Sequence, residues 1–144
     1  MDDDSLRDKL HKVYAAFGAG QFDEVIDMLD DHITMTSYAP VAVFPYLGRQ
    51  QGKEAVVATI HAAHAEFEYL SYTPVFMVTE QENAAVIVLA KLRKRTTGRI
   101  IQLFIADFLR LENGRIFELR EFMDSFDAVQ QVLGREIALS QKPR

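Results

Sequence analysis

The sequence predicts an α+β fold in which helices gather on one side of an antiparallel sheet. Two patterns along its 144 residues predict this fold. Apolar residues recur at helical spacing in the first half, and at the period of two that is typical of half-buried strands in the second half. The composition, 49% hydrophobic and 26% charged, is that of a globular protein, so we expect a single domain over residues 1–144.

Three helices are expected before the long strands. The first carries one apolar stripe and ends at Gly18 and Gly20, because glycine favours helix ends. A short strand follows the second helix, and an unusually apolar loop over residues 39–52 leads into the third. The expected helices span Leu6–Phe17, Phe22–Leu29 and Lys53–Glu68, and the short strand spans Ile33–Tyr38.

The second half is expected to form four strands and a last helix. Residues with turn-forming side chains separate the strands. The last helix is expected from Phe126 to Leu133, with Asp124 or Ser125 at its start and Gly134 at its end. The expected strands span Ser71–Thr79, Ala84–Thr96, Arg99–Leu111 and Arg115–Met123.

Composition excludes several kinds of site and partner. The chain has no cysteine, which excludes disulfides, thiol nucleophiles and cysteine-ligated zinc. Its net charge of −5 argues against nucleic acid as a partner, because binding phosphates requires a basic surface. No stretch approaches the ~18 apolar residues of a membrane span, so no membrane partner is expected. The acidic start, Met1 to Asp4, is unlike a secretory signal, so a cytoplasmic protein is expected.

One acidic residue interrupts the apolar pattern of the third expected strand. From Ile101 to Leu111, every second residue is apolar except Asp107. The face that carries this carboxyl group is therefore expected to be buried.

The turn before the last strand decides which side chains share the face of Asp107, because a shift of one residue moves every side chain to the other face. A two-residue Asn113-Gly114 loop would place charged residues beside apolar ones. A three-residue loop from Glu112 to Gly114, a type I turn closed by a bulge, would place Glu121 beside Asp107. The apolar neighbours on that face would be Phe117, Leu119 and Met123. The second arrangement is chemically consistent, so we predict that Asp107 and Glu121 face the same apolar concavity.

Two carboxyl groups in such a concavity are candidate catalytic residues. Apolar surroundings raise the pKa of a carboxyl group, and a second carboxyl nearby raises one of the two further. Such a pair suits proton transfer near neutral pH, which makes Asp107 and Glu121 the candidate acid and base. The alternative is a structural role, in which a neighbouring hydroxyl or an arginine satisfies the buried Asp107.

The opposite face of these strands mixes aromatic and charged side chains, with Phe104, Phe108 and Phe122 among arginines and glutamates. Aromatic residues and arginine are enriched at protein interfaces, so we predict a homodimer through this outer face. The alternative is a solvated face with scattered aromatic residues.

Three segments resemble the ketosteroid-isomerase and SnoaL-like group of the nuclear-transport-factor-2-like superfamily. They are the opening from Tyr14 to Asp23 with Met28 to Ile33, the helix start at Gly52 to Val56, and the hairpin from Ala106 to Ile116. The resemblance extends roughly from Leu6 to Gly134. It implies a cone-shaped, curved antiparallel sheet wrapped around the three helices of the N-terminal half, with a short C-terminal helix. It also implies an apolar pocket at the open end and, usually, a homodimer.

The residues that serve steroid isomerisation in that group are only partly present. Asp107 matches the group's protonated oxyanion-hole aspartate, whose pKa is tuned by an apolar site. The group's oxyanion tyrosine aligns with Val13, so Tyr14 lies one residue later, on another face of the helix. Its base aspartate aligns with Ser37, which cannot remove a proton from carbon. The resemblance therefore argues against a steroid isomerase, while some cyclase-like relatives carry an acidic residue in the last strand, as Glu121 would be here.

Further side chains are expected to line the pocket. Tyr14 either donates a hydrogen bond there or packs in the core, and the loop with Phe44 and Tyr46 either forms a lid or is pinned to the core. His61 and His64 share a helix face without a third ligand, so no metal site is expected. The candidate substrate-binding residues are Tyr14, Ser37, Phe44, Tyr46, Leu119 and Met123.

Three functions follow from these observations. The leading one is an acid/base enzyme of isomerase, cyclase or dehydratase type that acts on a small hydrophobic molecule without a cofactor. In it, Asp107 donates to a developing oxyanion and Glu121 moves the proton. The alternatives are a non-catalytic protein that binds or senses a hydrophobic ligand, and a dimeric protein-interaction module. The sequence does not identify the ligand, because one fold serves many functions.

Overall fold

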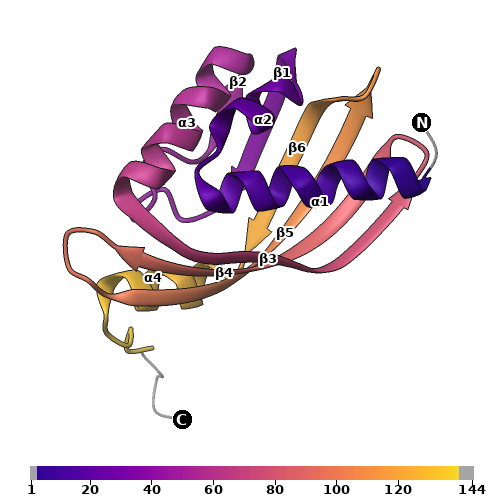
Figure 1. Cartoon of the computed structure of the whole chain (residues 1–144). Helices are drawn as coiled ribbons and strands as arrows, with labels where there is room; N and C mark the ends of the chain where they lie inside the picture. The colour runs from indigo at the N-terminus through magenta and orange to yellow at the C-terminus, as the bar shows by residue number, and fades with distance from the viewer. Residues whose placement is uncertain (1–2, 140–144) are drawn as a thin grey trace.

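A computed structural model describes residues 3–139, so Met1 and Asp2 of the acidic start lie outside the described range. The strands are β1 (Leu29–Tyr38), β2 (Arg49–Gln51), β3 (Phe67–Glu80), β4 (Asn83–Lys94), β5 (Ile100–Glu112) and β6 (Arg115–Met123). The helices are α1 (Asp3–Ala19), α2 (Phe22–Asp27), α3 (Lys53–Glu66) and α4 (Ser125–Leu133). The predicted α+β fold is confirmed (Figure 1).

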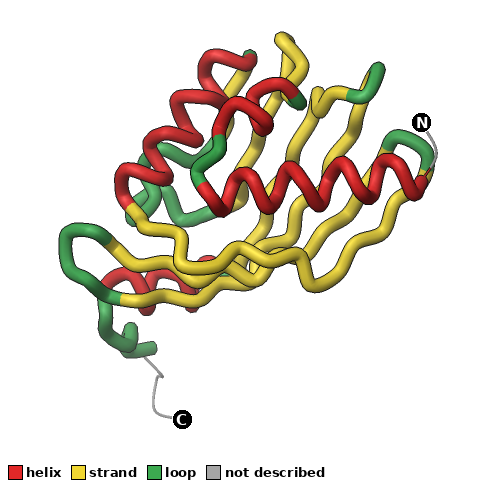
Figure 2. The backbone as a smooth tube through the Cα atoms, in the orientation of Figure 1, coloured by secondary structure: helices red, strands yellow, loops and turns green. Residues whose placement is uncertain are grey.

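The six strands form one curved sheet in the order β2-β1-β6-β5-β4-β3, and the sheet does not close into a barrel. Figure 2 shows α1 and α3 on the same side of the sheet, with α1 running across it. Between these helices and the sheet lies the core, and Leu6, Leu10 and Val88 are among its fully buried members. Within residues 3–139, no helix combines the length and the hydrophobicity needed to cross a membrane.

Two features of the sheet differ from the sequence prediction. The β1–β6 pair is parallel, whereas every other pair is antiparallel. The short strand β2, inside the expected loop, pairs with β1 and was not predicted, because three polar residues carry no alternating pattern. The third helix ends at Glu66 rather than Glu68, since the fully buried Phe67 already has extended backbone and pairs with Lys94.

The turn between β5 and β6 also differs from the prediction. It contains two residues, Asn113 and Gly114, both with positive φ (52° and 75°), as a type I′ turn requires. The extra residue sits in β6 instead, where the register shifts and Phe117 has no partner on β5. This bulge has the same effect on the register as the expected three-residue loop, so Asp107 still pairs with Glu121. Phe117 itself leaves the predicted inner row, and the buried Ile116 takes a place facing the core.

Helix α4 begins and ends as predicted. Asp124 is its N-cap and accepts a hydrogen bond from the Asp127 backbone N–H, and Gly134 is its C-cap with a left-handed φ of 70°. Figure 1 shows α4 away from α1 and α3, beside β4 and β5. Gln131 of α4 bonds both the backbone N–H and the backbone C=O of Gln102 on β5, at 2.7 and 2.8 Å. Strand β6 ends opposite Ile105, so Gln102 lies beyond its reach. The Gln131 side chain takes the place of a neighbouring strand there and pairs with the Gln102 backbone.

Candidate functional site

Three polar side chains form a row across the middle of the sheet. Ser37 on β1 is the register partner of Glu121 on β6, and Glu121 is the partner of Asp107 on β5. All three are buried, with exposed fractions of 5%, 9% and 3%. Burying polar groups costs free energy unless they are paired, so a row of three within an apolar face is a candidate functional site.

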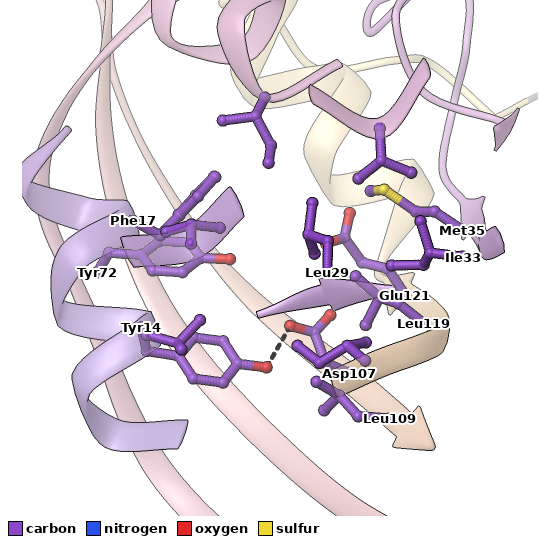
Figure 3. A pocket seen from close by; sticks show the side chains of 15 residues that line it. Tyr14, Phe17, Leu29, Ile33, Met35, Tyr72, Asp107, Leu109, Leu119 and Glu121 are labelled. Carbon is purple, nitrogen blue, oxygen red and sulfur yellow. Dashed lines mark hydrogen bonds between the residues drawn. The ribbon is translucent and has the colours of Figure 1, made fainter. Parts of the chain in front are cut away.

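Two members of the row, Asp107 and Glu121, line a cavity of about 100 Å³ between α1 and the sheet (Figure 3). Asp107 and Glu121 are the charged groups among the described lining residues, which are otherwise mostly apolar. Both carboxyls thus lie at the place expected from the sequence, while their role in a functional pocket stays a prediction. The apolar part of the lining includes Val25, Leu29, Ile33, Met35, Leu109 and Leu119.

Helix α1 brings a third polar group to the carboxyl pair. The Tyr14 hydroxyl donates a hydrogen bond to Asp107 Oδ2 at 2.7 Å, and Figure 3 shows the two side chains meeting inside the cavity. The neighbouring Val13 lines the same cavity but carries no hydrogen-bonding group on its side chain. Tyr14 therefore supplies here the hydroxyl that the resemblance would place at Val13.

The hydrogen bond from Tyr14 satisfies half of the Asp107 carboxyl. Its second oxygen, Oδ1, is buried and has no hydrogen-bond partner among the described residues. The buried hydroxyl of Ser37 also lacks a partner. It lies close enough to Glu121 to lower the pKa of that carboxyl, but it forms no hydrogen bond with any group in residues 3–139. The Tyr14 bond is what the structural alternative expects for Asp107, whereas the unpaired Oδ1 is not, because an unpaired buried group costs about 1–3 kcal/mol.

The two carboxyls have raised pKa values. Burial raises the pKa of Asp107 to about 6, against the lowering effect of the hydrogen bond from Tyr14 and of the adjacent Glu121 side chain. Burial, and then the charge of Asp107, raise the pKa of Glu121 well above its ordinary value. Near neutral pH, Asp107 therefore carries the charge and Glu121 keeps its proton.

A second cavity of about 70 Å³ lies under the loop that precedes β2. Phe44, Tyr46 and Met123 line this cavity, and Leu119 lines the first. The loop is pinned to the core, because Phe44 is buried and the Thr59 hydroxyl donates to the Tyr46 carbonyl at 3.3 Å. The candidate pocket residues named from the sequence are thus divided between two cavities, except Ser37, which lines neither.

Two tyrosines of β3 at these cavities were missed by sequence reasoning. Tyr69 lines the second cavity, and Tyr72 lines both. Tyr69 lies between the helix and the strand that the sequence predicted. The alternation around Tyr72 is interrupted by two register shifts of β3, between Tyr69 and Ser71 and between Pro74 and Phe76. The signal present in the sequence was Pro74, which follows both tyrosines within five residues and marks a place where regular strand pairing is interrupted.

The two histidines of α3 pack against aromatic rings. His64 stacks on Tyr69 with a centroid distance of 4.0 Å, and both His61 and His64 meet the Phe22 ring edge to face. Burial lowers the pKa of His64. In the described part of the chain, no three metal-ligating side chains are grouped in a way that would hold an ion.

The outer face of the sheet exposes aromatic side chains. Phe104, Phe108 and Phe122 are 61%, 49% and 40% exposed. Phe122 stacks on Tyr38 at 4.4 Å and meets Phe108 edge to face at 5.7 Å. This aromatic patch fits the predicted interface, and the homodimer remains a prediction.

Comparisons with known proteins agree with the fold. The sequence model of the SnoaL-like domain family matches residues 10–119 of this chain. A solved structure from Rhodopseudomonas palustris, described as a candidate isomerase, shares 32% identity, covers 85% of this chain and 91% of its own, and superimposes with a TM-score of 0.78. An NTF2-like protein from Burkholderia xenovorans shares 20% identity, with coverage of 92% and 98% and a TM-score of 0.77.

A candidate polyketide cyclase from Xanthomonas campestris shares 14% identity, with coverage of 88% and 96% and a TM-score of 0.76. The last two likenesses show the fold alone. Among curated protein sequences, none matches the chain at a significant level.

Proposed function

The chain belongs to the SnoaL-like domain family, and from this premise we propose that it is an acid/base enzyme that acts on a small apolar molecule. The observation that carries the proposal is the buried pair of carboxyls, Asp107 and Glu121, with the Tyr14 hydroxyl bonded to one of them. A carboxyl pair in which one member is ionised and the other protonated gives an enzyme both a base and an acid near neutral pH.

The charges favour a division of roles that differs from the one expected from the sequence. Asp107 is the base, because it is ionised and its Oδ1 is free to accept a proton from carbon. Glu121 is the acid, because it keeps its proton. After one turnover, the proton taken by Asp107 passes to Glu121, its cross-strand neighbour, and the pair is restored without a net gain or loss of protons.

The walls indicate the class of substrate. Apart from Asp107, Glu121 and the tyrosine hydroxyls, the described lining of the first cavity is apolar, so it suits a mostly hydrocarbon molecule. A carbon acid, such as a compound with a carbonyl group beside a C–H bond, offers the proton that Asp107 would remove. Isomerisation, cyclisation and dehydration all use this step, and the relative from R. palustris at 32% identity is described as a candidate isomerase.

Proton exchange tests the proposal without knowledge of the natural substrate. Nonan-5-one is incubated with the protein in D2O, and mass spectrometry follows the exchange of its α-protons. We expect Asp107→Asn to slow exchange by about 100-fold or more, because general acid/base groups contribute about 10²–10⁴ in rate. Glu121→Gln tests the acid, and Glu118→Gln, on the outer face of the same strand, is the matched control with wild-type exchange. Equal exchange by the wild type and Asp107→Asn would overturn the assignment.

The unpaired Asp107 Oδ1 at the first cavity also suits a non-catalytic carrier, whose ligand would donate a hydrogen bond to it. Native mass spectrometry of gently purified protein distinguishes this second function. A carrier retains a bound compound and shows no exchange, whereas an enzyme shows exchange that depends on Asp107.

A further inference from the structure

The two cavities are adjoining compartments of one interior space. Five side chains line both of them: Phe17, Met35, Ile60, Tyr72 and Glu121. Side chains, rather than backbone, therefore separate the carboxyl pair from the space beneath the loop with Phe44 and Tyr46. One ligand can extend into both compartments if it passes beside Tyr72 and Glu121.

Three tyrosine hydroxyls face this space without a partner. Within residues 3–139, the hydroxyls of Tyr46, Tyr69 and Tyr72 form no hydrogen bond, whereas that of Tyr14 is bonded to Asp107. Burial raises the pKa of each of the three, so each stays a neutral donor across the physiological range. A ligand oxygen in this space would give such a hydroxyl the hydrogen-bond partner that the described residues do not supply.

Tyr72 is the tyrosine that stands at the junction of the two cavities. Figure 3 shows its hydroxyl directed into the first cavity, on the side where Glu121 lies. Its ring stacks on the ring of Tyr14 with a centroid distance of 6.1 Å and an interplanar angle of 22°. A ligand oxygen at the junction would therefore meet a donor, Tyr72, beside the acid, Glu121.

The local backbone fixes the position of Tyr72. Register shifts of β3 on both sides of it, before Ser71 and after Pro74, bend the strand, and such bulges commonly re-aim a side chain beside a functional site. Gly18 of α1 lets the helix approach, because a Cβ atom there would lie 2.9 Å from the Tyr72 Cβ. Two independent features thus hold this hydroxyl at the junction.

We infer that the ligand spans both cavities and that Tyr72 donates a hydrogen bond to an oxygen in the middle of it. The inference rests on the proposed function in one respect, since it places the ligand oxygen beside the acid Glu121. The expected ligand class is an elongated apolar molecule with a carbonyl group flanked by carbon on both sides. A terminal oxygen would lie away from Tyr72 and Glu121, either at the apolar wall of the first cavity or near Tyr46 and Tyr69 in the second.

Two isomeric ketones test this inference. Nonan-5-one carries its carbonyl in the middle of the chain and nonan-2-one near one end, while both have the same atoms and nearly the same hydrophobicity. Binding to the wild type is measured by ligand-detected NMR, and the carbonyl stretch of the ¹³C-labelled ketone by infrared difference spectroscopy. We expect the wild type to bind nonan-5-one about tenfold more tightly and to lower its carbonyl frequency, because a hydrogen bond weakens the C=O bond.

Tyr72→Phe should remove both the preference and the frequency shift, while Tyr38→Phe, a tyrosine of the outer face that lines neither cavity, should keep both. A wild type that binds the two ketones equally, or binds neither, overturns the inference. If Tyr72→Phe does not fold, wild-type protein labelled with [¹³Cζ]tyrosine gives the same answer. The ketone must then shift the Tyr72 resonance, and an unmoved Tyr72 resonance overturns the inference.

The outcomes separate this inference from the proposed function. A ketone preference that depends on Tyr72, without proton exchange that depends on Asp107, would leave the binding mode standing and remove the enzyme. Exchange that depends on Asp107, without a preference between the ketones, would leave the enzyme standing and remove the binding mode.

Discussion

The Tyr14 hydroxyl donates a 2.7 Å hydrogen bond to Asp107 Oδ2, which joins the first helix to the middle of the sheet inside an apolar cavity. This bond stabilises the ionised form of Asp107 and so opposes the effect of burial on its pKa. It also leaves Oδ1 free, which is the geometry that a base requires.

Tyr14→Phe removes this donor and keeps the ring. We expect the pKa of Asp107 to rise above the value of about 6 that it has in the wild type, because burial is then opposed by Glu121 alone. Carboxyl-carbon NMR titration measures the change, with Tyr69→Phe as the control, since Tyr69 has no contact with Asp107. An unchanged titration midpoint would show that the hydrogen bond does not govern the charge of Asp107.

Stability should depend on pH through the same carboxyl. Folded Asp107 keeps its proton up to about pH 6, whereas in the unfolded chain it ionises near 3.8, so folding favours the protonated form. The resulting stabilisation is complete below about pH 4 and is lost as the pH rises through about 6. One unit of pKa corresponds to about 1.4 kcal/mol, so the loss is on the order of 3 kcal/mol.

Urea denaturation at pH 4, 6 and 8 measures this loss. Asp107→Asn should make the decline of the unfolding free energy between pH 4 and 8 shallower, since only the raised pKa of Glu121 then remains, and Glu118→Gln should keep the wild-type slope. The same slope in Asp107→Asn and the wild type would contradict a raised pKa for this residue.

The carboxyl pair Asp107 and Glu121 could be predicted from the sequence, whereas the cavity-lining tyrosines of β3, Tyr69 and Tyr72, could not. Asp107 is conspicuous because it interrupts strict alternation, and the register that joins it to Glu121 follows from keeping charges together. The expected three-residue turn was wrong, yet the bulge at Phe117 produces the same register. One extra residue in the strand shifts the pairing as much as one extra residue in the turn does. Tyr69 and Tyr72 lie where β3 shifts register, and a bulge changes the face of a side chain without a mark in the sequence pattern.

Gly18 offers a test of how Tyr72 is held. Alanine is normally favoured over glycine inside a helix by about 1 kcal/mol. At position 18, the added Cβ would meet the Tyr72 Cβ at 2.9 Å, so we expect Gly18→Ala to destabilise the protein by roughly 1–3 kcal/mol. Thermal and urea unfolding measure whether Gly18→Ala lowers or raises the free energy of unfolding. An equal or higher stability would mean that α1 and β3 separate without cost.

The outer face predicts an oligomer. Burying the exposed Phe104, Phe108 and Phe122 in a symmetric contact would remove a large apolar patch from water. We expect the wild type to be a dimer by analytical ultracentrifugation and Phe104→Glu to be a monomer, because two like charges would face each other across the contact. Phe126→Glu, on α4, is the exposed control. A monomeric wild type would favour the reading of a solvated face, or of a surface open to other proteins.

Gln131 links α4 to the part of β5 that β6 does not cover. Its removal should expose the backbone N–H of Gln102 to exchange. The side-chain amide accepts from the Gln102 N–H at 2.7 Å and donates to the Gln102 carbonyl at 2.8 Å. Gln131→Ala should therefore speed hydrogen exchange of the Gln102 amide by at least tenfold, while amides paired between β4 and β5 keep their rates. Gln130→Ala, which removes an acceptor of the Ile137 N–H instead, should leave the Gln102 amide protected. If Gln102 stays protected in Gln131→Ala, water exclusion by α4 rather than the amide pair protects this edge of the sheet.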